Sequence, residues 1–364
     1  MKQVVVGTLY CLYVILVSCV SSPSLDGNKE LPINFDNINE KYALSKYVDS
    51  VVVIPLETPD EALISNVFKI ELVDDRIYLL DFFQNALFVF DDHGKYMSKV
   101  LSEGRAPDEY LRLVNFSVSN DSIYMLDYTT QSILVCDRMF KFHRRIKYSN
   151  FSTELLVTDS VIMTYNEYDG SDNVFYFTEY GMGGEVKSNL LQRNFAVGEY
   201  NWGSANAFAF DDSNVYLSPR YSNYIYSYPN NADGRVLKLD FGKYNFPEKQ
   251  NIDNFDITDK GFSYIVKSYY AMKGDMLFLR LTYKSDPFYC FYDIESMEYS
   301  IGFPVNDLIP GFRFNAHLYT NGYIVDYLFP HMLEDDNTVA KKYFDRLGSM
   351  DNDSNPYLIL YRLK

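Results

Sequence analysis

The stretch Asp75-Arg-Ile-Tyr-Leu-Leu-Asp81, followed after five residues by Leu87-Phe-Val-Phe-Asp91, decides the fold because the chain repeats it. Asp121-Ser-Ile-Tyr-Met-Leu-Asp127 and Ile133-Leu-Val-Cys-Asp137 are similar to it at a constant shift of 46 residues. Each copy reads as a strand, a turn and a second strand. A repeat of this length and content is typical of a four-stranded blade of a β-propeller.

Weaker copies extend the repeat along the chain. They begin at Asp159, Val215, Met276 and His317. Turn-forming residues such as Asp74-Asp75 and His93-Gly94 stand where a blade needs tight turns. When the non-repeating stretches 244–262 and 328–354 are set aside, the length after Tyr47 corresponds to about six blades.

The two ends of the chain complete one blade. Pro356-Tyr-Leu-Ile-Leu-Tyr-Arg-Leu363 supplies the third strand of the last copy, after which the sequence ends. The apolar run from Tyr47 to Leu56 belongs to no hairpin of its own, so it is the natural fourth strand, and the pairing removes two exposed edges. The sequence therefore predicts an all-β fold: a six-bladed β-propeller of four-stranded blades over residues 47–364, closed by pairing an N-terminal strand with the C-terminal blade.

One insertion interrupts the last copy at residues 328–354. Within it, Met332 to Leu347 has the apolar spacing of a short helix, with Leu333, Val339, Tyr343, Phe344 and Leu347 on its apolar side. Two interpretations stay open, a lid over part of one face or a loop packed on the neighbouring blade.

The N-terminus carries a targeting signal. An apolar run from Val4 to Val17 ends in Leu16-Val-Ser-Cys19, which is typical of a bacterial lipoprotein signal peptide, with Cys19 as the lipidated residue. An ordinary secretory signal is the alternative. We expect residues 1–18 to be the signal peptide, 19–46 a lipid-anchored tether, and the protein to reside in the bacterial cell envelope at the outer membrane.

Composition agrees with this division. The 34 Tyr and 27 Phe favour half-buried strands. The net charge of −16 argues against nucleic acid as a partner, which requires basic clusters, and against attachment to a membrane by basic residues. The expected membrane attachment is therefore the N-terminal lipid.

Several kinds of chemistry lack a sequence signal. Cys136 and Cys290 fall in third strands of blades that face each other across the ring, so we expect two buried thiols and no disulfide. The four histidines are widely spaced, which makes a zinc cluster improbable, and the single Trp202 excludes the repeated Asp boxes of sialidase-type propellers. Asp351-Asn-Asp-Ser-Asn355 resembles the start of a calcium loop, but Pro356 stands where such a loop needs glycine.

Several segments resemble one family. The carriers are Ile54-Pro-Leu-Glu-Thr58, Ile77 to Asp81, Phe88 to Lys95, Glu103-Gly-Arg-Ala-Pro-Asp-Glu-Tyr110 and the terminal Asn355 to Lys364. They resemble the six-bladed β-propeller lipoproteins of Bacteroidetes-type bacteria, which are themselves similar to NHL-repeat propellers. The resemblance implies the fold and the envelope location, and it supplies no catalytic residues.

One face of the predicted ring is the candidate binding face, because the loops joining strands two and three and those joining blades emerge together there. The ligand-binding residues we expect on it are Arg105, Tyr110, Tyr168, Tyr200, Trp202, Arg220, Tyr221 and Arg313. Aromatic rings beside hydrogen-bonding groups suit a glycan or a peptide. The leading hypothesis is a non-catalytic protein that binds a glycan, peptide or partner protein without a cofactor. The alternative is a metal-dependent propeller hydrolase or lactonase with calcium in the central channel.

Overall fold

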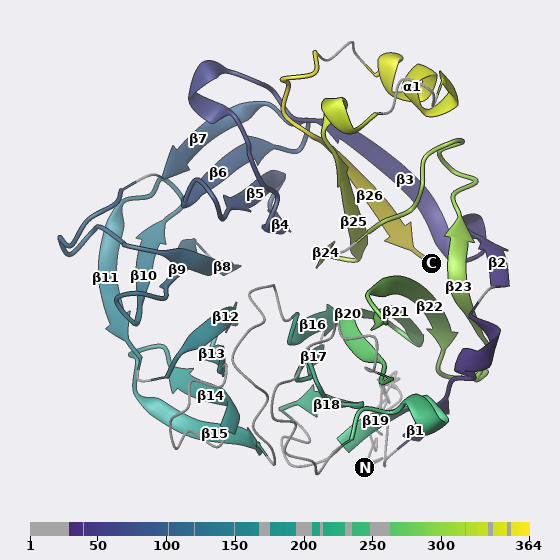
Figure 1. Ribbon diagram of the computed structural model, residues 1–364. Coiled ribbons are helices and arrows are strands. Elements are labelled where there is room, and N and C mark those ends of the chain that lie inside the picture. Colours follow the sequence, from purple (N-terminus) through teal and green to yellow (C-terminus); the bar gives the residue numbers. More distant parts are fainter. Residues whose placement is uncertain are drawn as a thin grey trace, which may run out of the picture.

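Six β-sheets surround a central axis in the computed structural model (Figure 1). The structure describes residues 29–364 except for the segments 39, 101, 120, 149, 167–174, 194–205, 212–213, 230–234, 248–262, 317, 334–337 and 348–350. Each sheet is one blade built on four antiparallel strands. The predicted six-bladed β-propeller of four-stranded blades is confirmed.

The first three blades follow the chain in order. Blade 1 contains β4 (Lys69–Val73), β5 (Arg76–Asp81), β6 (Ala86–Asp91) and β7 (Tyr96–Val100). Blade 2 contains β8 (Leu113–Ser119), β9 (Ser122–Asp127), β10 (Ser132–Asp137) and β11 (Phe142–Lys147). Blade 3 contains β12 (Ser152–Val157), β13 (Val161–Asn166), β14 (Phe175–Gly181) and β15 (Val186–Gln192).

The other three blades each recruit a strand from the N-terminal part of the chain. Blade 4 contains β16 (Phe208–Asp211), β17 (Asn214–Leu217), β18 (Tyr224–Tyr228) and β19 (Arg235–Asp240), with β1 (Lys29–Pro32) added outside. Blade 5 contains β20 (Val266–Lys273), β21 (Met276–Tyr283), β22 (Asp286–Asp293) and β23 (Tyr299–Val305), with β2 (Glu40–Ala43) added outside. Blade 6 contains β24 (Leu318–Thr320), β25 (Tyr323–Leu328), β26 (Tyr357–Leu363) and β3 (Val48–Pro55).

Ring closure is as predicted. β3 pairs antiparallel with β26, from Pro55 opposite Tyr357 to Val48 opposite Leu363. At the next junction, a Cβ on Gly94 of blade 1 would lie 2.2 Å from the carbonyl oxygen of Pro55, and the φ of Gly94 is +85°. Only glycine fits such a close approach in the left-handed region.

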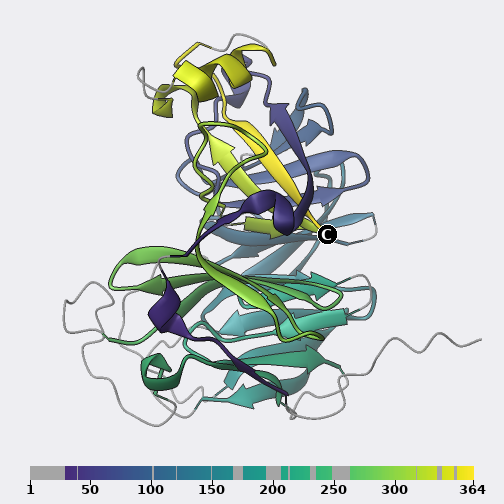
Figure 2. The same cartoon turned by 90° about the vertical axis from the view of Figure 1, so that its right-hand side faces the viewer.

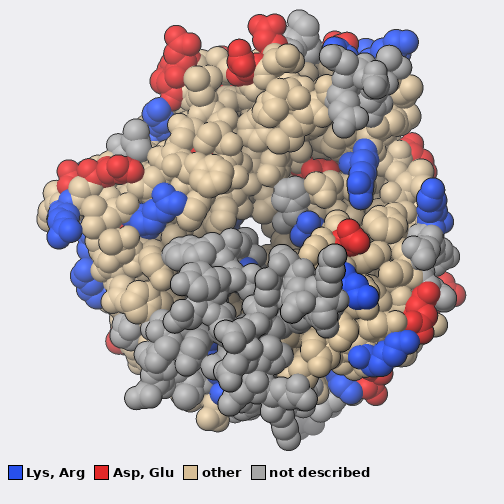
Figure 3. Space-filling view, viewed as in Figure 1, with Lys and Arg blue, Asp and Glu red and all other residues tan. Residues whose placement is uncertain are grey.

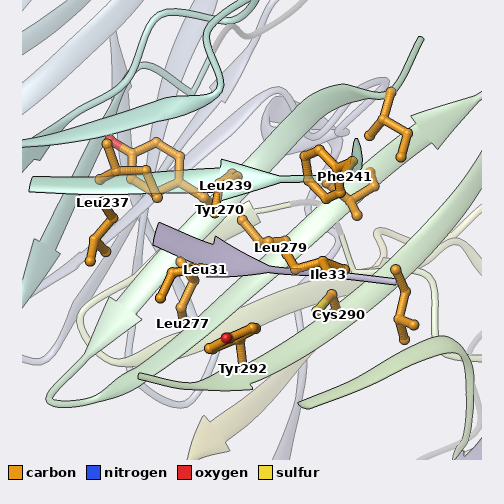
Figure 4. Close-up of a cluster of buried hydrophobic side chains, with 14 of the residues drawn as sticks. Leu31, Ile33, Leu237, Leu239, Phe241, Tyr270, Leu277, Leu279, Cys290 and Tyr292 are labelled. Atoms are coloured by element: carbon orange, nitrogen blue, oxygen red, sulfur yellow. The ribbon is translucent and has the colours of Figure 1, made fainter. Parts of the chain in front are cut away.

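The predicted tether over residues 19–46 is wrong for residues 29–46. β1 pairs in parallel with β19, and β2 pairs in parallel with β23. Leu31, Ile33 and Phe35 are buried among residues of blades 4 and 5 (Figure 4). Residues 29–46, which we call the belt, thus form part of the folded ring, and Figure 2 shows them crossing the outer edges of these blades. The reason is that β19 and β23 would otherwise leave unpaired edges and apolar side chains in water.

A buried aspartate at the end of the second strand organises the repeat. The Asp127 carboxylate accepts hydrogen bonds from the backbone amides of Leu111, Arg112, Thr129 and Thr130. Asp81 does the same in blade 1, one repeat earlier. One carboxylate therefore joins the loop that enters a blade to the turn that follows its second strand, and it satisfies donors that would otherwise be unpaired.

The insertion in blade 6 holds a shorter helix than predicted. α1 spans Thr338–Asp345, and the short 3-10 helix Pro330–Met332 precedes it. Phe344 is fully buried against Phe312 and Tyr357, whereas Val339 and Leu347 are exposed. α1 lies beside blade 6 at the rim of the ring (Figure 1), which favours the packed loop over the lid. None of the helices in the described residues has the length and apolar character to cross a bilayer.

Both remaining cysteines behave as predicted. Cys136 in β10 and Cys290 in β22 are free and buried. Burial raises the pKa of the Cys136 thiol to about 11 and raises that of Cys290 as well. They fill apolar positions in blades 2 and 5 and are chemically inert at neutral pH.

Candidate functional site

Antiparallel strand order gives the ring two distinct faces. The loops between second and third strands and the loops between blades lie on one face, which we call the loop face. The tight turns between first and second strands and between third and fourth strands lie on the other, the turn face. Asp74 and Asp75 form such a turn, with φ values of 48° and 56° that suit a two-residue hairpin.

The predicted site residues fall into three groups. Tyr168, Tyr200 and Trp202 lie outside the described residues. Arg105, Arg220, Tyr221 and Arg313 lie on loop-face segments, as expected, but in three separate sectors: the junction of blades 1 and 2, blade 4, and the junction of blades 5 and 6. The structure therefore does not gather these four residues into one cluster.

The prediction for Tyr110 is wrong. Its side chain is fully buried, and its hydroxyl donates hydrogen bonds to the carbonyl oxygens of Asn85 and Val100. Burial raises the pKa of Tyr110 to about 12. Tyr110 anchors the loop that leaves blade 1 and is not available to a ligand.

Arg145 of β11 contacts the same loop, which joins blades 1 and 2. Its guanidinium donates to the carbonyl oxygens of Pro107 and Glu109 and to the Thr130 and Ser132 hydroxyls. Arg145 is 18% exposed in its side chain and lies 3.9 Å from the buried Asp127 carboxylate. These contacts restrain the loop that carries Arg105.

A buried lysine lies beside Arg220. The Lys267 ammonium lies 3.3 Å from the carbonyl oxygen of Pro219, and the side chain is buried against the ring of Tyr270. Burial and, to a smaller extent, the positive charge of Arg220 lower the pKa of Lys267 to about 7, although Glu154 opposes the change. A cationic partner therefore meets an unfavourable charge in this sector of the loop face.

A small cavity of about 270 Å³ surrounds Arg313. Its other walls are Lys41, Tyr289 and the chain from Phe303 to Val305. Nearby, burial raises the pKa of Asp326 to about 7, although backbone amides of Asn315 and Tyr327 donate to its carboxylate and Arg280 is close. This sector is formed where the belt strand β2 meets blades 5 and 6.

A second hollow, the axial cavity, has a volume of about 660 Å³. First strands of all six blades supply its wall, and Figure 3, which views the loop face, shows the opening at the centre of the ring. Five of the residues that line it are Lys69, Glu71, Glu154, Phe210 and Tyr269. None of these five was among the site residues predicted from the sequence.

Three charged side chains of the axial cavity, Lys69, Glu71 and Glu154, have partners in the described residues. The Lys69 ammonium lies 3.0 Å from Glu71 and donates a 2.8 Å hydrogen bond to the Asn115 side chain. The Glu154 carboxylate accepts hydrogen bonds from the backbone amides of Asn206 and Ala207. These partners neutralise or satisfy the three charges, so none of the three requires an ionic ligand.

Two features of the cavity wall are left for a ligand. Tyr269 is 4% exposed, and no described residue is placed to hydrogen-bond its hydroxyl. The ring of Phe210 is 46% exposed, although it belongs to an inner strand. A buried hydroxyl and an uncovered ring combine polar and apolar contacts in one hollow.

The described residues offer no evident metal site. Among them, no group of three or more His, Cys, Asp or Glu side chains is placed to hold an ion. The calcium-dependent alternative therefore has no supporting observation in this part of the chain.

These features define a six-bladed β-propeller with a polar, charge-paired axial cavity. Residues 31–362 match the domain of unknown function DUF4934, and the chain belongs to that family. The solved structures it resembles include a protein of Bacteroides fragilis described as exported, with 19% identity, a TM-score of 0.72, and coverage of 93% of this chain and 99% of that one. A DUF4221 member from Bacteroides vulgatus has 10% identity, a TM-score of 0.53, and coverage of 87% and 97%. No curated protein matches the chain.

Proposed function

We propose that this protein is a lipid-anchored propeller of the bacterial cell envelope, held at the outer membrane, that binds a glycan without catalysis. Peptides and partner proteins are the other ligands that a loop face of this kind suits. The exported location described for the Bacteroides fragilis relative supports an extracytoplasmic site of action. The observation that carries the binding proposal is the axial cavity with its paired charges, unpartnered Tyr269 hydroxyl and uncovered Phe210 ring.

The physical match is with a neutral, hydroxyl-rich ligand. Sugar hydroxyls can accept from Tyr269 and donate to the Glu71 carboxylate, while a C–H face of the ring packs on Phe210. A strongly charged ligand would have to displace Glu71 from Lys69. Arg105, Tyr168, Tyr200, Trp202, Arg220, Tyr221 and Arg313 are proposed as further ligand contacts on the loop-face segments of the sequence.

A binding screen tests this proposal. The protein produced without residues 1–19 is titrated with soluble polysaccharides, oligosaccharides and a peptide mixture, and the fluorescence of its single tryptophan, Trp202, is followed beside calorimetry. We expect saturable binding of at least one glycan, weakened several-fold in Tyr269→Phe and in Phe210→Ala. Phe83→Ala is the matched control, because Phe83 is 72% exposed on the loop face of blade 1 and outside the cavity wall.

Two outcomes would contradict the proposal. If neither cavity substitution weakens binding but the double variant Trp202→Phe with Arg220→Ala does, the ligand binds at the loop face and not in the axial cavity. Turnover of a lactone or glycoside that requires added calcium would replace binding with catalysis.

The anchor has its own test. Cys19→Ala should give a protein that takes up no lipid label and partitions into the aqueous phase of a detergent extraction. Wild-type protein should remain with the detergent, because two or more acyl chains give stable membrane attachment. Lipid label on the Cys19→Ala protein would place the acylation elsewhere.

A further inference from the structure

The belt determines where the membrane anchor meets the propeller. The Lys29 ammonium donates a hydrogen bond to the carbonyl oxygen of Ile294. Ile294 follows the last residue of β22, and its own amide donates to Asp275, which lies in the turn between β20 and β21. Lys29 therefore lies against the turn face of blade 5.

The direction of β1 agrees with this placement. Lys29 is opposite Leu237 near the start of β19, and Pro32 is opposite Asp240 at its end. Because the strands are parallel, β1 begins on the side where β19 leaves its tight turn and runs toward the loop face. Figure 2 shows this oblique course of the belt over the ring. The chain thus enters the fold from the turn face.

The segment between the proposed lipid and the fold is short. Nine residues, 20–28, separate Cys19 from Lys29. Fully extended, such a segment spans about 35 Å, and as a flexible coil it spans about 17 Å. A compact domain of this size is about 50 Å across. The segment is therefore too short, in its usual extension, to let the loop face turn toward the bilayer.

We propose that the turn face of blades 4 and 5 is the membrane-proximal surface, and that the loop face points away from the bilayer. This inference rests on the lipid anchor in the proposed function and does not depend on what the cavity binds. In this proposal the length of the segment 20–28 determines which face lies near the bilayer.

Single cysteines placed on the two faces test the orientation. The native Cys136 and Cys290 are buried, so an introduced thiol is the one that a bulky polyethylene-glycol maleimide can reach in the folded protein. Glu295→Cys reports the turn face of blade 5, and Asp108→Cys reports the loop face between blades 1 and 2; both side chains are exposed. Full-length acylated protein is reconstituted in vesicles, and its labelling rate is divided by that of the same variant produced without residues 1–19.

We expect this ratio to be several-fold lower for Glu295→Cys than for Asp108→Cys. Insertion of about thirty Gly and Ser residues after Ser24 should bring the two ratios together, because a long flexible tether no longer fixes orientation. Equal ratios in an acylated protein with its native tether would overturn the orientation alone. A mass spectrum without acyl chains would instead overturn the anchor of the proposed function and this inference with it, whereas the glycan-binding result is independent of both.

Discussion

Replacing Leu31 with alanine tests whether the belt belongs to the folded ring. Leu31 is fully buried in β1, and its cluster includes Leu237 and Leu239 of β19 and Leu277 and Leu279 of β21. Truncation of a buried leucine removes its transfer free energy and leaves a cavity, so we expect the free energy of unfolding to fall by about 2–4 kcal/mol. A flexible tether would show no loss at all.

The assay is urea unfolding of the protein produced without residues 1–19, followed by circular dichroism. Glu30→Ala is the matched control in the same strand, because the Glu30 carboxylate is exposed and pairs with Lys238 at 2.6 Å. Such a surface pair contributes less than about 1 kcal/mol. Equal transition midpoints for Leu31→Ala and Glu30→Ala would refute the assignment of the belt to the core.

Three further predictions follow from single side chains. Asp127→Ala should lower the free energy of unfolding by about 3 kcal/mol, because four backbone amides lose their acceptor, whereas the control substitution at the exposed Asp121, Asp121→Ala, should change it little. Equal urea midpoints for the two variants would contradict the view that the Asp127 carboxylate stabilises the blade. Asp326→Asn should flatten the pH dependence of stability. In the wild type the folded pKa of Asp326, about 7, exceeds the ordinary value of 3.8, so the folded state binds more protons between these values and the free energy of unfolding falls as pH rises through them. An unchanged slope in Asp326→Asn would count against Asp326 as the source. Arg145→Ala should speed proteolytic cleavage between Ser102 and Tyr110, because the guanidinium binds three backbone carbonyls there, whereas the exposed Arg144→Ala should not. Identical cleavage rates would show that the loop is held by other contacts.

The repeat made most of the fold predictable from the sequence. A constant shift of 46 residues carries the positions of β5 and β6 onto β9 and β10, and the unpaired run before blade 1 identified β3 as the closing strand. The repeat did not predict the role of Asp81 and Asp127. It aligns the two aspartates, but the alignment does not show from which backbone amides their carboxylates accept hydrogen bonds.

The belt and the cavity were harder to predict for a different reason. Lys29–Pro32 is only four residues long, and one buried position among four gives no usable alternation. Tyr110 looked like a ligand contact because it lies in a loop between blades, yet its hydroxyl is satisfied by carbonyls of Asn85 and Val100. Glu154 and Tyr269 belong to strands more than one hundred residues apart, and only the closed ring brings them to one cavity.

The belt also sets the order in which the ring can be completed. The partner of β1 is β19, more than two hundred residues later, and the partner of β3 is β26, more than three hundred residues later. Synthesis proceeds from the N-terminus, so the first strands to appear must wait for the last ones. A polypeptide released early has no way to cover Leu31 or Val48, and it presents open strand edges that proteases and chaperones recognise. The pairing of β3 with β26 is therefore a built-in check that only chains containing the last strand complete the ring.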